Sequence, residues 1–189
     1  MSHAGVTAVL DANVLYPAPL RDYLLNLAQL NLFKPRWTDD IQEEWIYSLL
    51  AKRKDISRKS LESAKNAMNR AFPNANIVSY QSGINSIMLP DKKDRHVLAA
   101  AIKSDADTIV TFNTKDFPVS YLQTFSIRVY HPDDLILELM NDYKSECFLA
   151  LNNQVSRLQN PPKSIEEVLN ALRKSGLVKT VMLLKELIK

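Results

Sequence analysis

Three acidic residues that are far apart in the chain each stand next to a segment that could carry a carboxylate into a shared site. Asp11 ends the apolar run 6–10, Asp94 opens an alanine-rich run, and Asp116 follows the β-branched run 108–112. Carboxylates brought close together repel one another unless a cation lies between them, and magnesium and manganese prefer their hard oxygen atoms as ligands. The spacing therefore predicts a divalent-metal site, provided that the fold brings the three acids together.

Asp94 carries the clearest directional signal of the three. It shares one helical row with Leu98, because residues three or four apart lie on the same face. An acid in line with core residues points inward, where a lone carboxylate is costly unless it is paired or binds metal. Simpler roles stay open: a first-turn acid that answers the helix dipole for Asp94, a helix cap for Asp91, and turn residues for Asp11 and Asp116.

The segments around these acids alternate between strand and helix patterns. Short apolar or β-branched runs predict strands at 6–11, 76–80, 108–112 and 125–130. Helical periodicity predicts helices at 17–31, 38–53, 57–72 and 91–104. This alternation is typical of an α/β fold in three layers, with a parallel sheet of about four to five strands flanked by helices. Ligands in such folds collect at the carboxyl ends of the strands, where Asp11 and Asp116 fall.

The last third of the chain has a different pattern. From Pro132 onward we find only helical periodicity, so we predict an α/β domain at 1–131 and a C-terminal helical extension at 132–189. Ser164 and Glu167 form a capping box, and Gly176 is a helix stop. A final amphipathic row could pack on the core, form a dimer or bind a partner, and its members are Leu177, Val181, Leu184 and Leu187.

The composition excludes several classes of protein. A chain of 189 residues with 46% hydrophobic and 24% charged residues is expected to be globular. The sequence has no apolar stretch of about 18 residues, so we predict no membrane span, and we expect no signal peptide. The single cysteine, Cys147, permits no internal disulfide and no cysteine-rich zinc site; its apolar neighbours predict a buried thiol in a reducing cytoplasm. Three glycines exclude a glycine-rich phosphate loop, and the net charge of +3 permits a polyanionic partner.

The chain resembles the PIN-domain nucleases, and specifically VapC-type toxins of bacterial toxin–antitoxin pairs, in the segments VLDANVLYPAPLRD, WTDDIQEEW and LPDKKDRHVLAAAIKSDADTIVTFNTKDFP. Their order and spacing match over about residues 6–131. The resemblance implies a PIN-like fold with Asp11 as the first acid and Asp94 as the third. It also points to Glu44, beside Trp45, as the second acid. Helical periodicity alone does not choose between Glu43 and Glu44, because both border the apolar arc of their helix.

The resemblance further implies a metal-dependent endoribonuclease that hydrolyses RNA with Mg²⁺ or Mn²⁺. The implied catalytic acids are Asp11, Glu44, Asp94 and Asp116, and the implied metal ligands are Asp11, Asp94, Asp116 and Asn113. The fourth position is open, because Asn113 stands where many members carry aspartate. A homodimer and a cognate antitoxin protein are also implied as partners.

Residues around the acids suggest how RNA could be held. Asn13 and Thr111 could hydrogen-bond the ligands or the substrate. Basic residues could contact backbone phosphates, with Arg95 preferred; they are Arg21, Lys92, Lys93, Arg95 and Lys115. His96 is expected to be a packed helix residue. Aromatic side chains could stack on bases, although core packing is the simpler expectation for them; they are Tyr16, Trp37 and Phe117.

Two other functional classes fit parts of the sequence. The first is a catalytically weak or inactive PIN fold that binds RNA or serves as a scaffold. Asn113 is compatible with this class, because it stands where many family members carry aspartate. The second is a haloacid-dehalogenase-like phosphatase, because LDANV has a strand-end aspartate. That chemistry needs a second aspartate two residues later, where this chain has Asn13.

Overall fold

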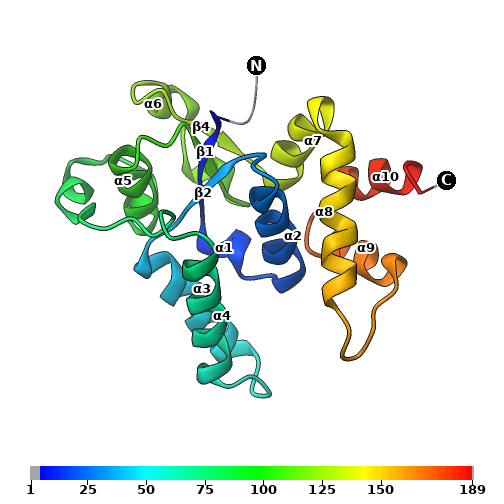
Figure 1. Ribbon diagram of the computed structural model, residues 1–189. Helices are drawn as coiled ribbons and strands as arrows, with labels where there is room; N and C mark the ends of the chain where they lie inside the picture. The colour runs from blue at the N-terminus through cyan, green and yellow to red at the C-terminus, as the bar shows by residue number, and fades with distance from the viewer. Residues whose placement is uncertain (1–4, 189) are drawn as a thin grey trace.

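A four-stranded parallel sheet lies at the centre of the computed structural model, which describes residues 5–188 (Figure 1). The strands are β1 (Thr7–Leu10), β2 (Lys34–Arg36), β3 (Thr108–Val110) and β4 (Arg128–Tyr130). Their order is β2-β1-β3-β4, with Val9 opposite Arg36 on one side and Ile109 on the other. The predicted α/β class with a flanked parallel sheet is thereby confirmed.

Two strand predictions differ from the structure. Residues 34–36 form the edge strand β2 although they include Pro35, because an edge strand tolerates a residue that cannot donate to the ladder. The predicted strand at 76–80 is wrong. Asn76 forms only an isolated bridge with Trp37, and the chain turns at Ser79, whose φ is 61°.

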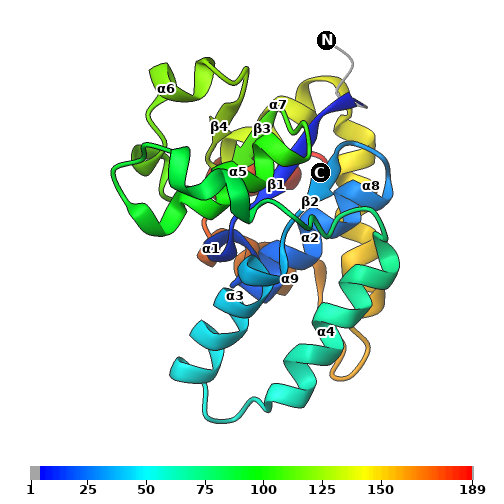
Figure 2. The same ribbon diagram turned by 90° about the vertical axis from the view of Figure 1, so that its left-hand side faces the viewer.

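Helices cover both faces of the sheet (Figure 2). They are α1 (Ala12–Leu15), α2 (Ala18–Gln29), α3 (Asp39–Lys52), α4 (Arg58–Ala71), α5 (Arg95–Lys103) and α6 (Val119–Gln123). The helix α5 contacts β1 and β3. The helix α2 contacts β2. The hydroxyl of Thr38 accepts a hydrogen bond from the amide of Ile41 and caps α3, as its position before the apolar periodicity predicts.

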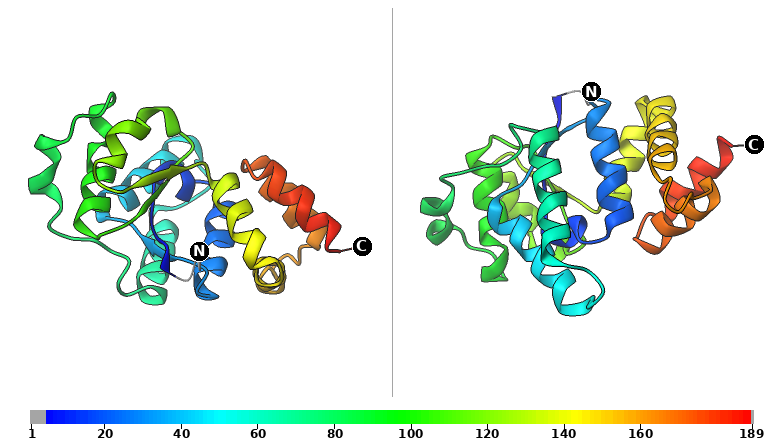
Figure 3. Two further views of the ribbon diagram at one scale, coloured as in Figure 1. Left: turned by 90° about the horizontal axis from the view of Figure 1, so that it is seen from above. Right: turned by 60° about the horizontal axis from the view of Figure 1, so that its bottom comes forward.

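Four further helices follow the last strand and lie together beside α2 (Figure 3). They are α7 (Pro132–Asp142), α8 (Lys144–Arg157), α9 (Ile165–Lys174) and α10 (Val178–Glu186). The predicted capping box of Ser164 and Glu167 begins α9. Hydrogen bonds tie α8 to α2, from the hydroxyl of Tyr23 to the carbonyl of Cys147 at 2.9 Å and from the amide of Gln154 to the carbonyl of Pro19 at 2.9 Å. Cys147 is buried, as predicted. In residues 5–188, no helix has the length and apolar character needed to cross a bilayer.

The turn between α9 and α10 brings the helical extension against the end of β3. Gly176 has a φ of 100°, a conformation that favours glycine, and it ends α9 as the sequence predicts. A Cβ atom at Gly176 would lie 2.7 Å from Cε1 of Phe112, which follows β3. The close approach of backbone to ring therefore requires a residue without a side chain.

We expect Gly176→Ala to lower the free energy of unfolding by about 2–4 kcal/mol, because alanine meets both an unfavourable φ and a clash. Urea unfolding followed by circular dichroism measures the change. The control is Gly83→Ala, where an added Cβ meets no atom within 4 Å. Equal stability of the two variants would contradict the proposed packing of this turn.

Candidate active site

A cleft of about 930 Å³ opens where β1 ends and α1 begins, beside α3. Its walls come from segments that are far apart in the chain. Acidic residues dominate its polar lining: Asp11, Glu43, Glu44, Asp91 and Asp94. The fold thus brings Asp11, Glu44 and Asp94 to one cleft.

Asp11 is fixed at the floor of this cleft by its neighbours. Its side chain is 5% exposed. One carboxylate oxygen accepts a hydrogen bond from the amide of Ala12 at 2.7 Å. The other accepts from the amide group of Asn13 and from the hydroxyl of Thr111, each at 2.7 Å. Burial raises the pKa of Asp11 despite the hydrogen bonds from Thr111 and Ala12, which oppose the increase.

Asn13 and Thr111 hold Asp11 and the end of β3 in one network. Besides their bonds to Asp11, the Asn13 Nδ2 donates to the Thr111 hydroxyl at 2.9 Å. The Asn13 Oδ1 accepts from the amide of Phe112 at 3.1 Å, and the Thr111 hydroxyl accepts from the amide of Asn113 at 3.0 Å. Their polar atoms are thus engaged with Asp11 and the backbone, which makes them positioning residues in this structure.

Asp94 is partly buried, and within residues 5–188 it forms no ion pair, although the charge of His96 acts on it weakly. Its Oδ2 is buried and has no hydrogen-bond partner in the described part of the chain. Burial first, and then the charges of Asp11, Asp91 and Asp116, raise the pKa of Asp94 to about 6. Each of these three carboxylates therefore lies close enough to repel Asp94. Asp91 also caps the short 3-10 helix Lys92–Asp94, because its carboxylate accepts from the amide of Lys93 at 2.8 Å.

Glu43 and Glu44 have different partners. Glu43 forms ion pairs on the outside of the protein with Arg58 at 2.7 Å and Lys65 at 3.2 Å, both from α4. Glu44 instead lies 3.1 Å from Nε2 of His96, which belongs to α5. The structure thus directs Glu44 toward the helix that begins at Asp94 and holds Glu43 against α4.

His96 is the mostly buried cationic group next to the acids. Burial lowers its pKa, but the hydrogen bond that its Nε2 donates to Glu44 and the charges of Glu44, Asp11 and Asp40 outweigh burial and raise the pKa above its ordinary value. The sequence predicted only a packed helix residue here. The structure places it as the partner of Glu44, and helical spacing from Asp94 gave no hint of this contact.

The carboxylate oxygens are suitable ligands for a divalent cation, although they are not gathered around one point. Within residues 5–188, no three His, Cys, Asp or Glu side chains are gathered tightly enough to form a ready-made metal-ligand cluster. The buried, unpartnered oxygen of Asp94 and the mutual repulsion of the acids are what a bound cation would relieve. The set is made of hard oxygen donors, which match a divalent ion such as those that PIN-domain ribonucleases generally use.

The other predicted residues are divided between the cleft and the rest of the protein. Asn113, Lys93 and Tyr16 line the cleft. Asp116 lies in the 3-10 helix Thr114–Asp116 and acts on Asp94 through its charge. Arg95 is not among the residues that line the cleft, and its Nε is buried without a hydrogen-bond partner in residues 5–188.

Three suggested RNA contacts lie away from the acids. Arg21 packs over the ring of Trp45, 4.3 Å from the centroid, and donates to the carbonyl of Leu15 at 2.6 Å. Trp37 and Phe117 are fully buried, so core packing, the simpler expectation, is correct. Conversely, the sequence gave no reason to single out Tyr47, which lines the cleft and is 74% exposed.

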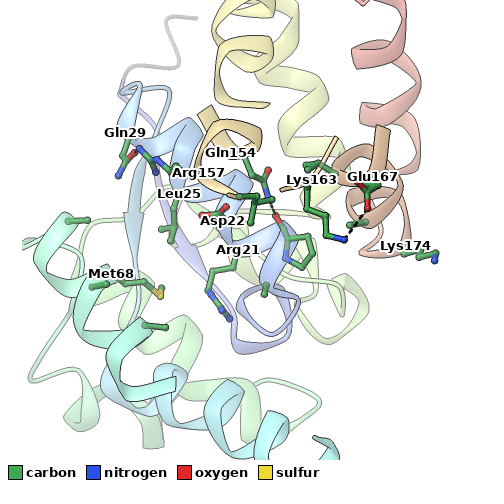
Figure 4. Close-up of a pocket in the computed structure, with 18 of the residues that line it drawn as sticks. Arg21, Asp22, Leu25, Gln29, Met68, Gln154, Arg157, Lys163, Glu167 and Lys174 are labelled. Atoms are coloured by element: carbon green, nitrogen blue, oxygen red, sulfur yellow. Dashed lines mark hydrogen bonds and ion pairs between the residues drawn. The ribbon is translucent and has the colours of Figure 1, made fainter. Parts of the chain in front are cut away.

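A second cavity, of about 780 Å³, lies between the helical extension and α2 and α4 (Figure 4). Its labelled residues include Leu25 from α2, Met68 from α4 and Gln154 from α8. None of the candidate acids lines it. The acid cleft and this cavity are therefore separate features.

Comparison with known proteins gives two family matches. The sequence profile of the PIN domain matches residues 7–115, and the profile of the VapC50 C-terminal domain matches residues 132–186. A protein of Mycobacterium tuberculosis (strain ATCC 25618 / H37Rv), named "Putative ribonuclease VapC50", is 35% identical over 103 residues. That alignment covers 53% of this chain and 61% of the relative, so it spans less than two thirds of the relative's length. No solved structure matches the chain.

We expect Asp94→Asn to raise the melting temperature of the metal-free protein at pH 7.5. The folded-state pKa of about 6 lies above the ordinary value of 3.8, so the folded protein binds more protons than the unfolded chain between these values. Stability contributed by this group therefore falls as pH rises from about 4 through about 6. Because Asp94 is only partly buried, solvent screening limits the gain to on the order of 1 kcal/mol, or roughly 2–4 °C.

Thermal unfolding in EDTA at pH 4.5 and pH 7.5 measures this effect. The gain should be largest at pH 7.5 and fall to roughly a third of that at pH 4.5, which lies between the two pKa values, and the exposed control Glu186→Gln should show no gain at either pH. A lower melting temperature of Asp94→Asn at both pH values would show that the carboxylate is not under repulsion.

Proposed function

The chain belongs to the PIN-domain family and is of the VapC type, and from this premise we propose that it is a metal-dependent endoribonuclease, the toxin of a toxin–antitoxin pair. One observation carries the proposal. Segments separated by dozens of residues bring Asp11, Glu44 and Asp94 to one cleft, where burial and the charges of Asp11, Asp91 and Asp116 raise the pKa of Asp94 to about 6. Repulsion among carboxylates destabilises the fold, and a bound cation would relieve it.

In this proposal each acid has its own task. Mg²⁺ or Mn²⁺, when bound, polarises the scissile phosphate and provides an activated water. Asp11 and Asp94 are the direct ligands, with Asn13 and Thr111 keeping the Asp11 carboxylate in one orientation. Glu44, held by His96, orients the attacking water or adds a ligand.

Two residues, Asn113 and Asp116, are candidates for the fourth acid position of the site, and their properties are complementary. Asn113 lines the cleft and can offer its amide oxygen, whereas Asp116 supplies negative charge that reaches Asp94. We propose that both contribute: Asn113 would offer its amide oxygen to a bound metal ion, and Asp116 would add negative charge to the site. Lys93, which lines the cleft, contacts the backbone phosphates of the substrate.

The partners follow from the same proposal. The cognate antitoxin silences the enzyme by covering the acidic cleft, and the chain acts as a homodimer. The rival function, an RNA-binding scaffold without catalysis, draws on Asn113 and on the lack of a ready-made ligand cluster in the described residues. Calorimetric titration separates the two, because only the nuclease should bind Mn²⁺ at millimolar concentration or below.

We expect Asp11→Asn to reduce cleavage of cellular RNA by at least about 100-fold in the presence of Mn²⁺, because it removes a charged ligand from the floor of the cleft. Asparagine has nearly the same shape, so circular dichroism should show an unchanged fold. Gel analysis of RNA after timed incubation measures the loss. Undiminished cleavage by the folded variant would exclude Asp11 from the catalytic site.

The two neighbouring glutamates offer a matched comparison. We expect Glu44→Gln to reduce the cleavage rate by about 10-fold or more, because it removes a charge that faces the cleft. Glu43→Gln should leave the rate within about 2-fold, because Glu43, although it also lines the cleft, is held by Arg58 and Lys65 and its charge is already neutralised. If the two effects are reversed, the second acid of the site is Glu43.

A further inference from the structure

Tyr47 is an exposed aromatic residue for which the fold provides no role. Its side chain is 74% exposed, and in residues 5–188 its hydroxyl has no hydrogen-bond partner. Tyrosine usually buries most of its ring. Because Tyr47 contributes neither to the core nor to a polar network of the described residues, its position on the wall of the acid cleft calls for a functional explanation.

Tyr47 lies on the same face of α3 as the acid that we assign to the site. Glu44, Tyr47, Ser48 and Ala51 all line the cleft at helical spacing. Tyr47 is one turn beyond Glu44, about 4.5 Å along the helix axis. Its neighbours Ser48 and Ala51 have small side chains, and the high exposure of Tyr47 leaves its ring accessible to a flat group.

A second aromatic residue and a cation line the same cleft. Tyr16 follows α1, and the ammonium group of Lys52 lies 5.4 Å from the centroid of its ring. Lys93 is a further cation of the lining. The acids alone would repel a polyanion, so attachment needs both these cations and contacts that carry no charge, which tyrosine rings provide.

We propose that Tyr47, with Tyr16, forms a stacking platform for unpaired RNA bases beside the scissile phosphate, while Lys52 and Lys93 contact the flanking phosphates. The inference rests on the proposed ribonuclease function and assigns to Tyr47 the task of holding an unpaired base next to the site of cleavage. Bases in an A-form duplex are stacked on one another and their faces are covered, whereas unpaired bases can stack on aromatic side chains. A duplex therefore gains nothing from Tyr47.

The experiment measures binding in EDTA, where no metal-dependent cleavage occurs. The probes are a 12-nucleotide single-stranded RNA with one 2-aminopurine and the blunt duplex of the same sequence. We expect Tyr47→Ala to weaken single-strand binding by about 5- to 100-fold and to leave duplex binding unchanged. Tyr47→Phe and Tyr47→Trp should retain single-strand affinity within about 3-fold, because they keep the ring. Quenching of 2-aminopurine fluorescence on binding should disappear in Tyr47→Ala alone.

The control is Met182→Ala, which removes an apolar side chain that is 63% exposed and lies outside the cleft. It should behave as the wild type. Absent single-strand binding by the wild type, an unchanged Tyr47→Ala, or equal losses for single strand and duplex would overturn the platform. Failure of the nuclease proposal is recognised separately, as lack of Mn²⁺-dependent cleavage by a wild type whose binding still depends on Tyr47.

Discussion

Repulsion among carboxylates at the carboxyl end of β1 is the constraint to which the rest of the structure responds. Asp11 is buried by the sheet and α5, and Asp94 faces it from the start of α5 with an oxygen that no described group satisfies. A fold selected for stability alone would replace such acids with neutral residues. Their retention is understandable if the cleft is completed by a cation, since the same negative charge that destabilises the empty site supplies the binding energy.

The surrounding residues limit this cost without removing it. Asn13, Thr111 and the amide of Ala12 give Asp11 three hydrogen bonds, which fix its orientation. His96 offsets part of the charge, but it contacts Glu44 and leaves Asp11 and Asp94 without a direct basic partner in the hydrogen bonds and ion pairs of residues 5–188. A lysine between Asp11 and Asp94 would have argued against a metal site. The structure instead pairs the one neighbouring histidine, His96, with Glu44, and no ion pair of residues 5–188 neutralises Asp11 or Asp94.

The sequence predicted what depends on local pattern and missed what depends on distant contacts. The alternation of strand and helix patterns predicted the parallel sheet. The position of Asp11 at the end of a strand predicted its place in the site. The strand expected at 76–80 failed because Ser79 turns the chain, which β-propensity does not register. The difference between Glu43 and Glu44 could not be read from periodicity, since it is set by Arg58 and Lys65 on one side and by His96 on the other. Tyr47 was missed because nothing local distinguishes a surface tyrosine in a cleft from one elsewhere.

The helical extension is connected to the acids by a short chain of contacts. Gly176, between α9 and α10, lies against the ring of Phe112, and the amide of Phe112 donates to the side chain of Asn13, which in turn donates to Asp11. Buried residues of the extension belong to the same hydrophobic core as the sheet. Because interiors are close-packed, a shift of the turn at Gly176 is transmitted to Phe112 rather than absorbed in empty space. The extension therefore supports the end of β3, and with it the orientation of the carboxylate on which the site is built.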